Sequence, residues 1–515
     1  MLTAALRSVN LQAQRTIMTS SAALSGKLSA LKNPLLVKSQ SFINNEWVGS
    51  ASGKTFKVHD PSTGEQIGPD VEECGSPAEV EKAIKVAKEA FKTYQNTTPK
   101  SRQDMLTKLY NLMLANTDDL ATIITAENGK PLADAKGEHM YSASFCEWFA
   151  AEAMRTYGDV IPATIPGMRN VVIKQPVGPV AIITPWNFPS AMITRKIAPA
   201  LAAGCTCVIK VPAETPFSGL ALAQLVKEAG FPAGVVNIIT SEDSKTVGEI
   251  LCASKDIKKV SFTGSTNVGK ILASQSASTL KKLSLELGGN APFIVFNDAD
   301  IDAAVQGAIA CKFRSSGQTC VCANRILVHT DVAAEFTEKL VAAVEKFKVG
   351  DGAEQGITHG PLIHSRALDK VEHHVNDAVE RGAKVLAGGK RIKGNFFQPT
   401  VLGDVPADAA CLSEETFGPL AAIVKFSSEE QVIEIANDTD VGLAGYFYSR
   451  DVGRIWRVAE ALEVGMVGVN TGVISQATIP FGGVKESGYG REGSKYGMSD
   501  YEITKVICMG GLGTS

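Results

Sequence analysis

The sequence predicts an α/β protein made of more than one structural unit. Short, continuous apolar runs alternate with helical patterns through much of the chain, which is typical of parallel strands covered by helices on both faces. A glycine-rich turn at residues 262–270 follows one such run and opens a helical pattern. A chain of 515 residues is also too long for one simple core, so we expect two or three units.

The first 38 residues have the composition of a mitochondrial transit peptide. They contain no Asp or Glu and many Ser, Ala and Leu residues. Their basic residues are Arg7, Arg15, Lys27, Lys32 and Lys38. We therefore expect a protein of the mitochondrial matrix; the alternative is a cytoplasmic protein with a disordered tail. Met18 offers a second start that would remove the first basic residues.

The next segment is predicted to be mainly helical. Ser76, Pro77 and Glu79 have the spacing of a capping box with proline at the first helical position. Further helical patterns cover residues 102–114 and 139–157. Two β-like runs, residues 159–166 and 170–175, then flank a Pro-Gly turn, which predicts a hairpin.

Two α/β series follow. The first has apolar runs and a helical pattern at residues 217–229, which indicates a dinucleotide-binding type of domain. Its predicted strands are residues 180–184, 205–210, 235–240, 259–263 and 291–296. The second series and the β-like tail comprise helical patterns at 332–347 and 367–381 and strand-like runs at 421–426, 465–469 and 501–509.

Composition and residue spacing exclude several classes of partner. A net charge of −3 gives no electrostatic basis for binding nucleic acid, and no apolar run approaches the roughly 18 residues that span a bilayer. The ten cysteines are scattered without framework spacing, which indicates reduced thiols inside a cell. No zinc-ligand spacing is present, so we expect no metal, no nucleic acid and no membrane partner.

The glycine-rich turn places Gly264 and Ser265 where free backbone N–H groups favour a phosphate. Its spacing satisfies the beginning of a P-loop, G-x-x-x-x-G-K. However, Ile271 stands where Mg²⁺ binding requires a hydroxyl, so we reject a P-loop NTPase. A contact with a pyrophosphate remains the prediction.

Three other positions are candidates for chemistry. Cys320 lies in a polar, glycine-broken loop at residues 313–322, a natural place for a nucleophile, although a cysteine can equally be a small buried side chain. Asn187 follows a predicted strand, where its amide could donate to an oxyanion. Glu286 has an apolar, glycine-flanked setting that would raise its pKa toward that of a general base.

Six motifs together resemble the aldehyde dehydrogenase superfamily. They are TPWNFP at 184–189, FTGSTNVG at 262–269, ELGG at 286–289, GQTC at 317–320, ETFGP at 415–419 and PFGG at 480–483. The resemblance extends from about Phe42 to the C-terminus. It implies a Rossmann-like NAD(P)-binding domain (39–158 and 177–291), an α/β catalytic domain (292–496) and a β-hairpin oligomerisation element (159–176 and 497–515). It also implies a homotetramer or homodimer.

The same resemblance implies roles for individual residues. Cys320 would attack the aldehyde, Asn187 would hold the oxyanion, and Glu286 would activate water to hydrolyse a thioester. The cofactor, NAD or NADP, would contact Trp186, Lys210, Ala213, Gly264, Ser265, Leu287, Glu415 and Phe417. Ala213 stands where an acid would repel a 2′-phosphate, although Glu214 is adjacent, so the choice of cofactor stays open.

Within the superfamily, the chain is similar to succinate-semialdehyde dehydrogenases. The similarity lies in SAMITRK at 190–196, Arg314, NTGVIS at 470–475 and GREGSKYG at 490–497. It implies that Arg195, Arg314 and Ser475 bind the distal carboxylate of a small carboxylated aldehyde. By spacing alone, Arg195 would be a solvated helix charge. The alternatives are a longer substrate such as glutarate semialdehyde, or a silent nucleotide-binding relative, which the presence of Cys320 and Glu286 disfavours.

Cys322, two residues after the predicted nucleophile, suggests a redox switch. A reactive thiol must be partly ionised and accessible, and these properties also favour oxidation. A Cys320–Cys322 disulfide would close a small, strained ring and should therefore be reducible. The alternative is that Cys322 is only a packing residue.

Overall fold

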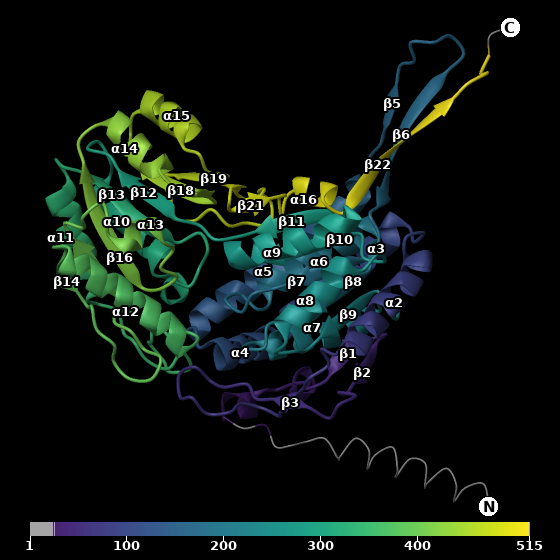
Figure 1. Ribbon diagram of the computed structural model, residues 1–515, viewed down its shortest axis with the longest axis horizontal. Coiled ribbons are helices and arrows are strands. Elements are labelled where there is room, and N and C mark those ends of the chain that lie inside the picture. Colours follow the sequence, from purple (N-terminus) through teal and green to yellow (C-terminus); the bar gives the residue numbers. More distant parts are fainter. Residues whose placement is uncertain (1–23, 25, 514–515) are drawn as a thin grey trace, which may run out of the picture.

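The computed structural model describes Leu24 and residues 26–513, which form two α/β lobes and a projecting antiparallel arm (Figure 1). Each lobe is centred on one large sheet, and the chain crosses from the first lobe to the second after β11. The predicted α/β class is therefore confirmed. In the described residues, no helix is both long and apolar enough to cross a membrane.

The first sheet has a parallel centre, β9-β8-β7-β10-β11, with antiparallel strands added at both edges. In spatial order the strands are β2 (Glu46–Val48), β1 (Ser41–Ile43), β9 (Val236–Ile239), β8 (Cys207–Lys210), β7 (Val180–Ile183), β10 (Lys259–Thr263), β11 (Lys282–Glu286) and β21 (Gly488–Tyr489). Strand β21 comes from near the C-terminus, so a segment close to the end of the chain completes one edge of this sheet. Its partner β11 ends at Glu286.

Helices cover both faces of this sheet, as continuous apolar strands require. Along β7, Val180 and Ile182 pack into the core on one face, while Ala181 packs into the core on the other. The first face carries α3 (Pro99–Ala115), α5 (Leu132–Glu152), α6 (Ala191–Ala203) and α7 (Pro216–Ala229), with α4 (Thr117–Asn128) beside α5 and α7. The second carries α2 (Pro77–Tyr94), α8 (Ser244–Ala253) and α9 (Thr266–Ser276).

The second lobe is built on a seven-stranded sheet. In order its strands are β14 (Lys384–Ala387), β15 (Thr400–Gly403), β16 (Leu420–Phe426), β13 (Ala323–His329), β12 (Ala291–Val295), β18 (Ala444–Tyr448) and β19 (Met466–Val469). Its helices are α10 (Ile301–Lys312), α11 (Ala333–Val344), α12 (Ser365–Glu380), α13 (Ala410–Ser413), α14 (Glu429–Asn437) and α15 (Val452–Ala461). The pairs β15-β16, β16-β13, β13-β12, β12-β18 and β18-β19 are parallel.

The arm is a three-stranded sheet that projects from the first lobe (Figure 1). Strand β6 (Arg169–Pro176) pairs antiparallel with β5 (Asp159–Ile161) on one side and with β22 (Glu502–Met509) on the other. The predicted hairpin and β-like tail are thus confirmed, and they lie in one sheet. Short pairs β3 (Thr55–Phe56) with β4 (Val71–Glu72), and β17 (Val441–Gly442) with β20 (Val484–Lys485), complete the strands, and the short helix α16 (Tyr496–Ser499) precedes β22.

Several predicted boundaries differ from those in the structure. The run at residues 291–296 is β12 of the second sheet, not a strand of the first. The helix predicted at 139–157 begins earlier, at Leu132, and ends at Glu152. Helix α4 was not predicted because almost its whole surface is buried, so it lacks an amphipathic pattern. Only the first three residues of the run at 159–166 form a strand; Pro162 and Pro166, which have no N–H to donate, lie in the rest.

The predicted leader, residues 1–38, falls mostly outside the described residues. Its last part, residues 26–38, packs on the first lobe through two short 3₁₀ helices, Gly26–Ala30 and Pro34–Leu36. Leu28 and Leu36 are fully buried in the core, and Lys27 Nζ lies 2.5 Å from Asp60 and 2.6 Å from Asp351. This packing does not support a cleavable segment that extends to Lys38.

Candidate active site

Cys320 lies on the loop between α10 and β13, and the backbone of that loop follows an unusual path. Ser315, Ser316 and Gly317 have positive φ angles of 49°, 54° and 75°. A Cβ atom on Gly317 would lie 2.1 Å from the carbonyl oxygen of Gly418, so only glycine fits there. The Cys320 side chain, three residues after this turn, is half-buried.

Asn187 reaches the same loop from the end of β7. Its Nδ2 donates to the carbonyl oxygen of Gln318 at 3.0 Å, which leaves the second amide N–H for another acceptor. Gln318 is itself fixed, because its Oε1 accepts from the N–H of Ile363 at 3.0 Å. Asn187 is thus held beside the cysteine loop with a spare donor.

Glu286, at the end of β11, is a buried carboxyl group. It is 2% exposed, and neither of its oxygens has a hydrogen-bond partner in the described residues. Burial raises its pKa well above the ordinary value, and the negative charge of Glu492 raises it further against the opposing charges of Arg195 and Lys196. The group therefore keeps its proton at low pH and becomes a base as the pH rises.

Arg195 is not a solvated helix charge. It is 1% exposed, its Nε donates to Glu492, and its guanidinium lies 4.2 Å from the ring centre of Phe481. Lys196, also buried, donates to the other oxygen of Glu492. Burial alone would raise the pKa of Glu492, but the charges of Arg195 and Lys196 outweigh it and hold the pKa below its usual value.

We expected the thiol of Cys320 to be partly ionised, but the structure favours the neutral thiol. Burial raises its pKa to about 12, and the nearby carboxyl groups of Glu415 and Glu286 raise it while Arg195 lowers it. A neutral thiol is favoured because a thiolate would lose its hydration in this site. A nucleophile at this position therefore requires a base that removes the proton as it attacks.

Nine of the predicted site residues line one cavity of about 180 Å³. They are Trp186, Asn187, Gly264, Ser265, Glu286, Leu287, Cys320, Glu415 and Phe417. These residues come from the carboxyl ends of β7, β10 and β11 and from the facing loops of the second lobe. The cavity brings the thiol, the amide and the buried carboxyl group to one space between the lobes.

One wall of this cavity, where α9 begins, suits a phosphate of a dinucleotide. Ser265 caps α9, its Oγ accepting from the N–H of Val268 at 3.4 Å, so the other free N–H groups of the first turn remain for a phosphate. A Cβ on Gly264 would lie 2.4 Å from the ring of Phe262, so a larger residue would displace that ring. Glu415 also lines this cavity, and burial raises its pKa to about 7.

Lys210 and Ala213 line neither this cavity nor the second one described below. Lys210 ends β8, and its Nζ donates to Ser244 Oγ on α8 at 2.7 Å. Burial lowers its pKa to about 8, opposed by the charges of Glu214 and other acids. Ala213 is half-buried and Glu214 is exposed. An adenosine would have to extend along the sheet edge to reach these residues.

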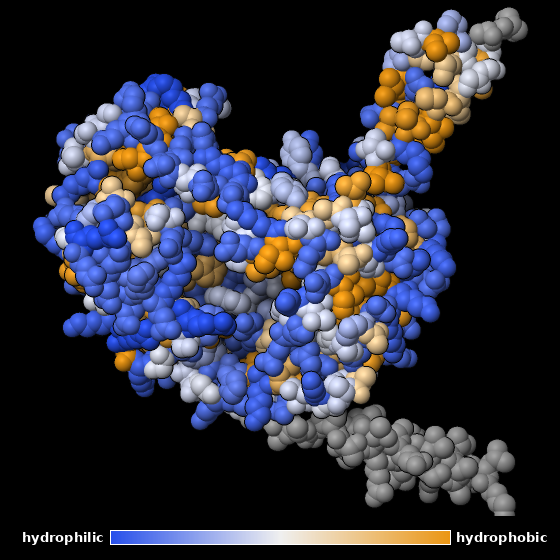
Figure 2. Space-filling model, viewed as in Figure 1, coloured by the Kyte–Doolittle hydropathy of each residue, from blue (hydrophilic) through white to orange (hydrophobic). Residues whose placement is uncertain are grey.

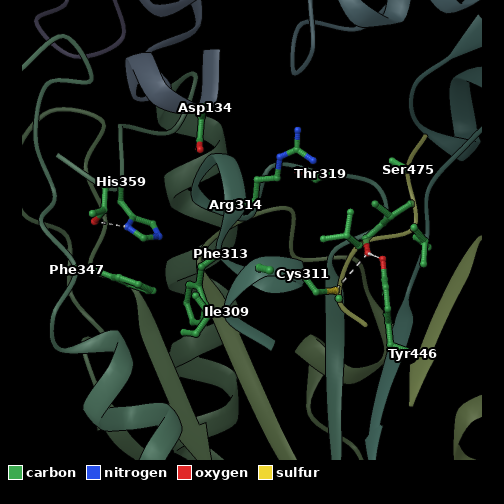
Figure 3. Close-up of a pocket in the computed structure, with 16 residues that line it drawn as sticks. Asp134, Ile309, Cys311, Phe313, Arg314, Thr319, Phe347, His359, Tyr446 and Ser475 are labelled. Carbon is green, nitrogen blue, oxygen red and sulfur yellow. Dashed lines mark hydrogen bonds between the residues drawn. The ribbon is translucent and has the colours of Figure 1, made fainter. Parts of the chain in front are cut away.

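Arg314 and Ser475 line a second cavity of about 420 Å³ (Figure 3). In this view Arg314 projects from the middle of the wall, with Asp134 to one side and Ser475 to the other. Thr319, adjacent to Cys320, also lines it. Arg195 lines neither cavity, so the three predicted carboxylate-binding residues do not share one wall.

Cys322 is buried, at 7% exposure, and lines neither cavity. Its N–H donates to the carbonyl oxygen of Thr319 at 3.0 Å. Burial raises the pKa of its thiol, and Lys312 opposes the shift. Both Cys320 and Cys322 are free thiols here.

Three charged residues near the site were missed by sequence reasoning: Glu492, Lys130 and Glu138. Lys130 Nζ donates to Glu138 at 2.6 Å and to the carbonyl oxygen of Asn187 at 2.7 Å. Glu492 stands within the GREGSKYG motif, which was noted only as a resemblance. No local pattern marks a pairing with Arg195 across 297 residues.

A model described as the aldehyde dehydrogenase family matches residues 47–507. Glutarate-semialdehyde dehydrogenase of Pseudomonas putida is 56% identical over 93% of this chain and 99% of its own length. The mitochondrial succinate-semialdehyde dehydrogenase of Homo sapiens is 54% identical over 95% and 91%. The crystal structure of a succinate-semialdehyde dehydrogenase from Burkholderia pseudomallei is 54% identical, covers 93% of this chain and 100% of that one, and superimposes with a TM-score of 0.92.

Proposed function

The chain belongs to the aldehyde dehydrogenase family, and from this premise we propose that it oxidises succinate semialdehyde to succinate with NAD or NADP. The observation that carries the proposal is the cavity that holds Cys320, Asn187 and Glu286 together. Bound in this cavity, the nicotinamide supplies the hydride acceptor.

The first step is attack by Cys320 on the aldehyde carbon. The thiol of Cys320 passes its proton to solvent, which acts as the base, as the C–S bond forms, and the carbonyl oxygen gains negative charge. The spare N–H of Asn187 and the backbone N–H of Cys320 are the donors we assign to this oxygen. Loss of hydride from the same carbon leaves a thioester on the sulfur.

The second step is hydrolysis of the thioester, for which we assign Glu286 as the base. An ionised Glu286 takes a proton from water as the water attacks the thioester carbon. Collapse of the adduct breaks the C–S bond and releases the acid; the departing thiolate takes the proton from Glu286, which restores the neutral thiol and the ionised carboxylate. Burial of Glu286 without a hydrogen-bond partner in the described residues supports this role, because no donor holds its charge in the resting site.

For the substrate, we assign Arg195, Arg314 and Ser475 to the distal carboxylate. Arg195 supports this assignment because its Nη2 is buried and has no hydrogen-bond partner in the described residues. Arg314 and Ser475 lie together in the second cavity, beside Thr319. A guanidinium group that binds the distal end of the substrate would favour an aldehyde that carries a carboxylate over an uncharged one.

A second candidate substrate is glutarate semialdehyde, one methylene longer. The relative from Pseudomonas putida that bears this name is 56% identical, a value similar to that of the succinate-semialdehyde relatives. A single methylene changes binding only modestly, by about 1–3 kcal/mol in an apolar pocket. The preferred length of the aldehyde is therefore decided by the relative rates with the two substrates.

We further propose a homo-oligomer, either a dimer or a tetramer, that associates through the projecting arm. Apolar side chains gather along this arm (Figure 2). The exposed ones are Val160, Ile161, Ile503, Val506, Ile507 and Met509. A contiguous apolar surface on a thin arm is best covered by another copy of the chain. Sedimentation of the purified protein tests this: a monomer at micromolar concentration would contradict it.

For location we propose the mitochondrial matrix, with a leader that ends before Gly26. The human relative with 54% identity is a mitochondrial protein by name, and the basic, acid-free leader supports import. The packing of Leu28 and Leu36 supports the shorter leader. Sequencing the N-terminus of the protein recovered from cells tests it.

The experiment that tests the function is a substrate panel run with NAD and NADP in parallel. The panel contains succinate semialdehyde, glutarate semialdehyde and butanal, and it measures kcat/KM from nicotinamide reduction. We expect the highest value for succinate semialdehyde and the lowest for butanal. Equal values for all three would contradict carboxylate recognition, and the ratio between the cofactors answers the question that Ala213 leaves open.

A further inference from the structure

A buried ion pair lies behind the loop that carries Asn187. Lys130 Nζ is 2.6 Å from Glu138 Oε2, and the two side chains are 1% and 0% exposed. Lys130 lies in the short connection between α4 and α5, and Glu138 lies on α5. Neither residue lines the cavity that contains Cys320, and neither takes part in the steps above.

The pair holds both ends of this loop. Lys130 Nζ donates to the main-chain carbonyl oxygen of Asn187 at 2.7 Å. The other carboxylate oxygen of Glu138 accepts from the N–H groups of Ser190 at 3.0 Å and Ala191 at 3.4 Å, where α6 begins. One ion pair therefore binds the backbone at the carbonyl group of Asn187 and again three residues later, at the N–H of Ser190.

Two further contacts tie the same loop to the same segment. Asn128 Nδ2 donates to the carbonyl oxygen of Trp186 at 3.0 Å. The Lys130 ammonium lies 4.0 Å from the ring centre of Phe188, a cation–π distance. The backbone from Trp186 to Ala191 is thus anchored by side chains of residues 128–138.

Stability alone does not account for this arrangement. Moving two charges out of water costs several kcal/mol each by general estimate, and an apolar pair of the same volume is often as stable or more stable. Burial lowers the pKa of Lys130, which shows the same penalty on its charge, with Glu138 opposing it. An apolar pair, however, could not bind a carbonyl oxygen at one end and two N–H groups at the other.

We propose that Lys130 and Glu138 are positioning residues for Asn187. They fix the backbone of the loop so that the Asn187 amide keeps its direction toward the oxyanion and toward Gln318. The proposal rests on the oxyanion role given to Asn187 in the proposed function. It does not depend on which aldehyde is the substrate.

The test is a double-mutant cycle between the ion pair and Asn187. Lys130→Met combined with Glu138→Gln removes both charges with little change in volume; Asn187→Ala removes the amide. The measurement is the single-turnover rate of nicotinamide reduction, with cofactor affinity from nicotinamide fluorescence. Lys136→Met is the matched control, because Lys136 lies on α5 with Glu138 but is half-exposed.

We expect the charge-free pair to slow the single turnover about 10- to 100-fold, with cofactor affinity and KM changed less than about twofold. In the Asn187→Ala background, the same pair of substitutions should cause no further loss, since the group they position is gone. Lys136→Met should behave as wild type. Losses that simply multiply would overturn the proposal, because they would mean that the pair acts independently of Asn187.

A variant that does not fold can be distinguished from an aldehyde that is not the substrate. If thermal unfolding shows that the charge-free pair does not fold, Lys130→Met alone replaces it in the cycle, because it removes the ammonium that binds the Asn187 carbonyl; wild-type turnover in that variant overturns the proposal. If succinate semialdehyde is not oxidised, the cycle is run with the best aldehyde of the panel. If Asn187→Ala alone leaves the rate unchanged, the oxyanion role fails and the positioning role fails with it.

Discussion

The guanidinium of Arg195 lies 4.0 Å from the carboxyl oxygen Oε2 of Glu286, in the interior of the protein. The same guanidinium donates to Glu492, so one cation stands between two acids. Glu492 is held ionised by this contact, whereas burial keeps the pKa of Glu286 high. The two acids therefore have opposite protonation preferences, and Arg195 links the proposed substrate site to the proposed base.

The first prediction follows from this linkage. Replacing Glu492 with Gln removes a charge that raises the Glu286 pKa and leaves Arg195 and Lys196, which lower it. A base works only when deprotonated, so activity rises with pH through the Glu286 pKa, and this rise should move to lower pH in the variant. The measurement is kcat against pH from about 5 to 9. Glu81→Gln, an exposed acid on α2, is the control; an unmoved profile in E492Q contradicts the linkage.

The second prediction concerns the nucleophile. Cys320→Ala should bind the cofactor as wild type does, yet give no thioester and less than about a thousandth of the wild-type rate. Mass spectrometry of enzyme quenched during turnover checks for the thioester. Turnover above that level would show that another group attacks the aldehyde.

The third prediction concerns the base. Glu286→Gln should allow one round of hydride transfer and then stall, because no group activates the water that cleaves the thioester. Stopped-flow absorbance should show a burst of reduced nicotinamide near one per site, followed by very slow turnover. A steady state close to wild type would remove Glu286 from the mechanism.

The fourth prediction concerns substrate choice. Arg314→Ala should weaken the transition state for succinate semialdehyde by about 2–5 kcal/mol, the range for losing one partner of a desolvated charge pair. Butanal should be oxidised as well as by wild type, since it has no carboxylate. The control is Arg366→Ala, at an exposed position. Equal losses for both aldehydes would mean that Arg314 only supports the loop.

The fifth prediction concerns Cys322. Peroxide should oxidise the half-buried Cys320 thiol to a sulfenic acid, and attack by the Cys322 thiol would then form a disulfide and release water. Wild type should lose activity and recover it with a dithiol, while Cys322→Ala should over-oxidise and stay inactive. Identical behaviour of the two proteins would leave Cys322 as a packing residue.

Local patterns predicted the elements that local forces determine. The capping box at Ser76 and Glu79 begins α2, and the apolar run at 259–263 is β10. The motifs also selected residues that converge on one cavity, because strand ends and glycine turns of parallel sheets meet at one edge. Arg195 shows the limit: its helix pattern predicts exposure, yet its partner Glu492 makes burial possible from 297 residues away.

Cys320 shows a second limit. Its position in the loop follows from the motif, but the state of its thiol depends on burial by two lobes and on three charged groups from other elements. Likewise, nothing near Lys130 in the sequence indicates that its ammonium binds the backbone of Asn187. Contacts between distant segments decide protonation and orientation, and sequence spacing does not encode them.

The pairing of Glu492 with Arg195 and Lys196 also bears on the biosynthesis of the protein. During translation the two cations on α6 leave the ribosome long before Glu492 and strand β21, which completes the edge of the same sheet. Until then, full burial of α6 would leave two positive charges without their counter-ion, a state of high energy. We therefore expect the first lobe to complete its native core only after the segment that carries Glu492 and β21 is synthesised. A chain cut short before Gly488 would keep every motif of the active-site cavity, but the first lobe would lose the counter-ion of its two buried cations and would be unstable.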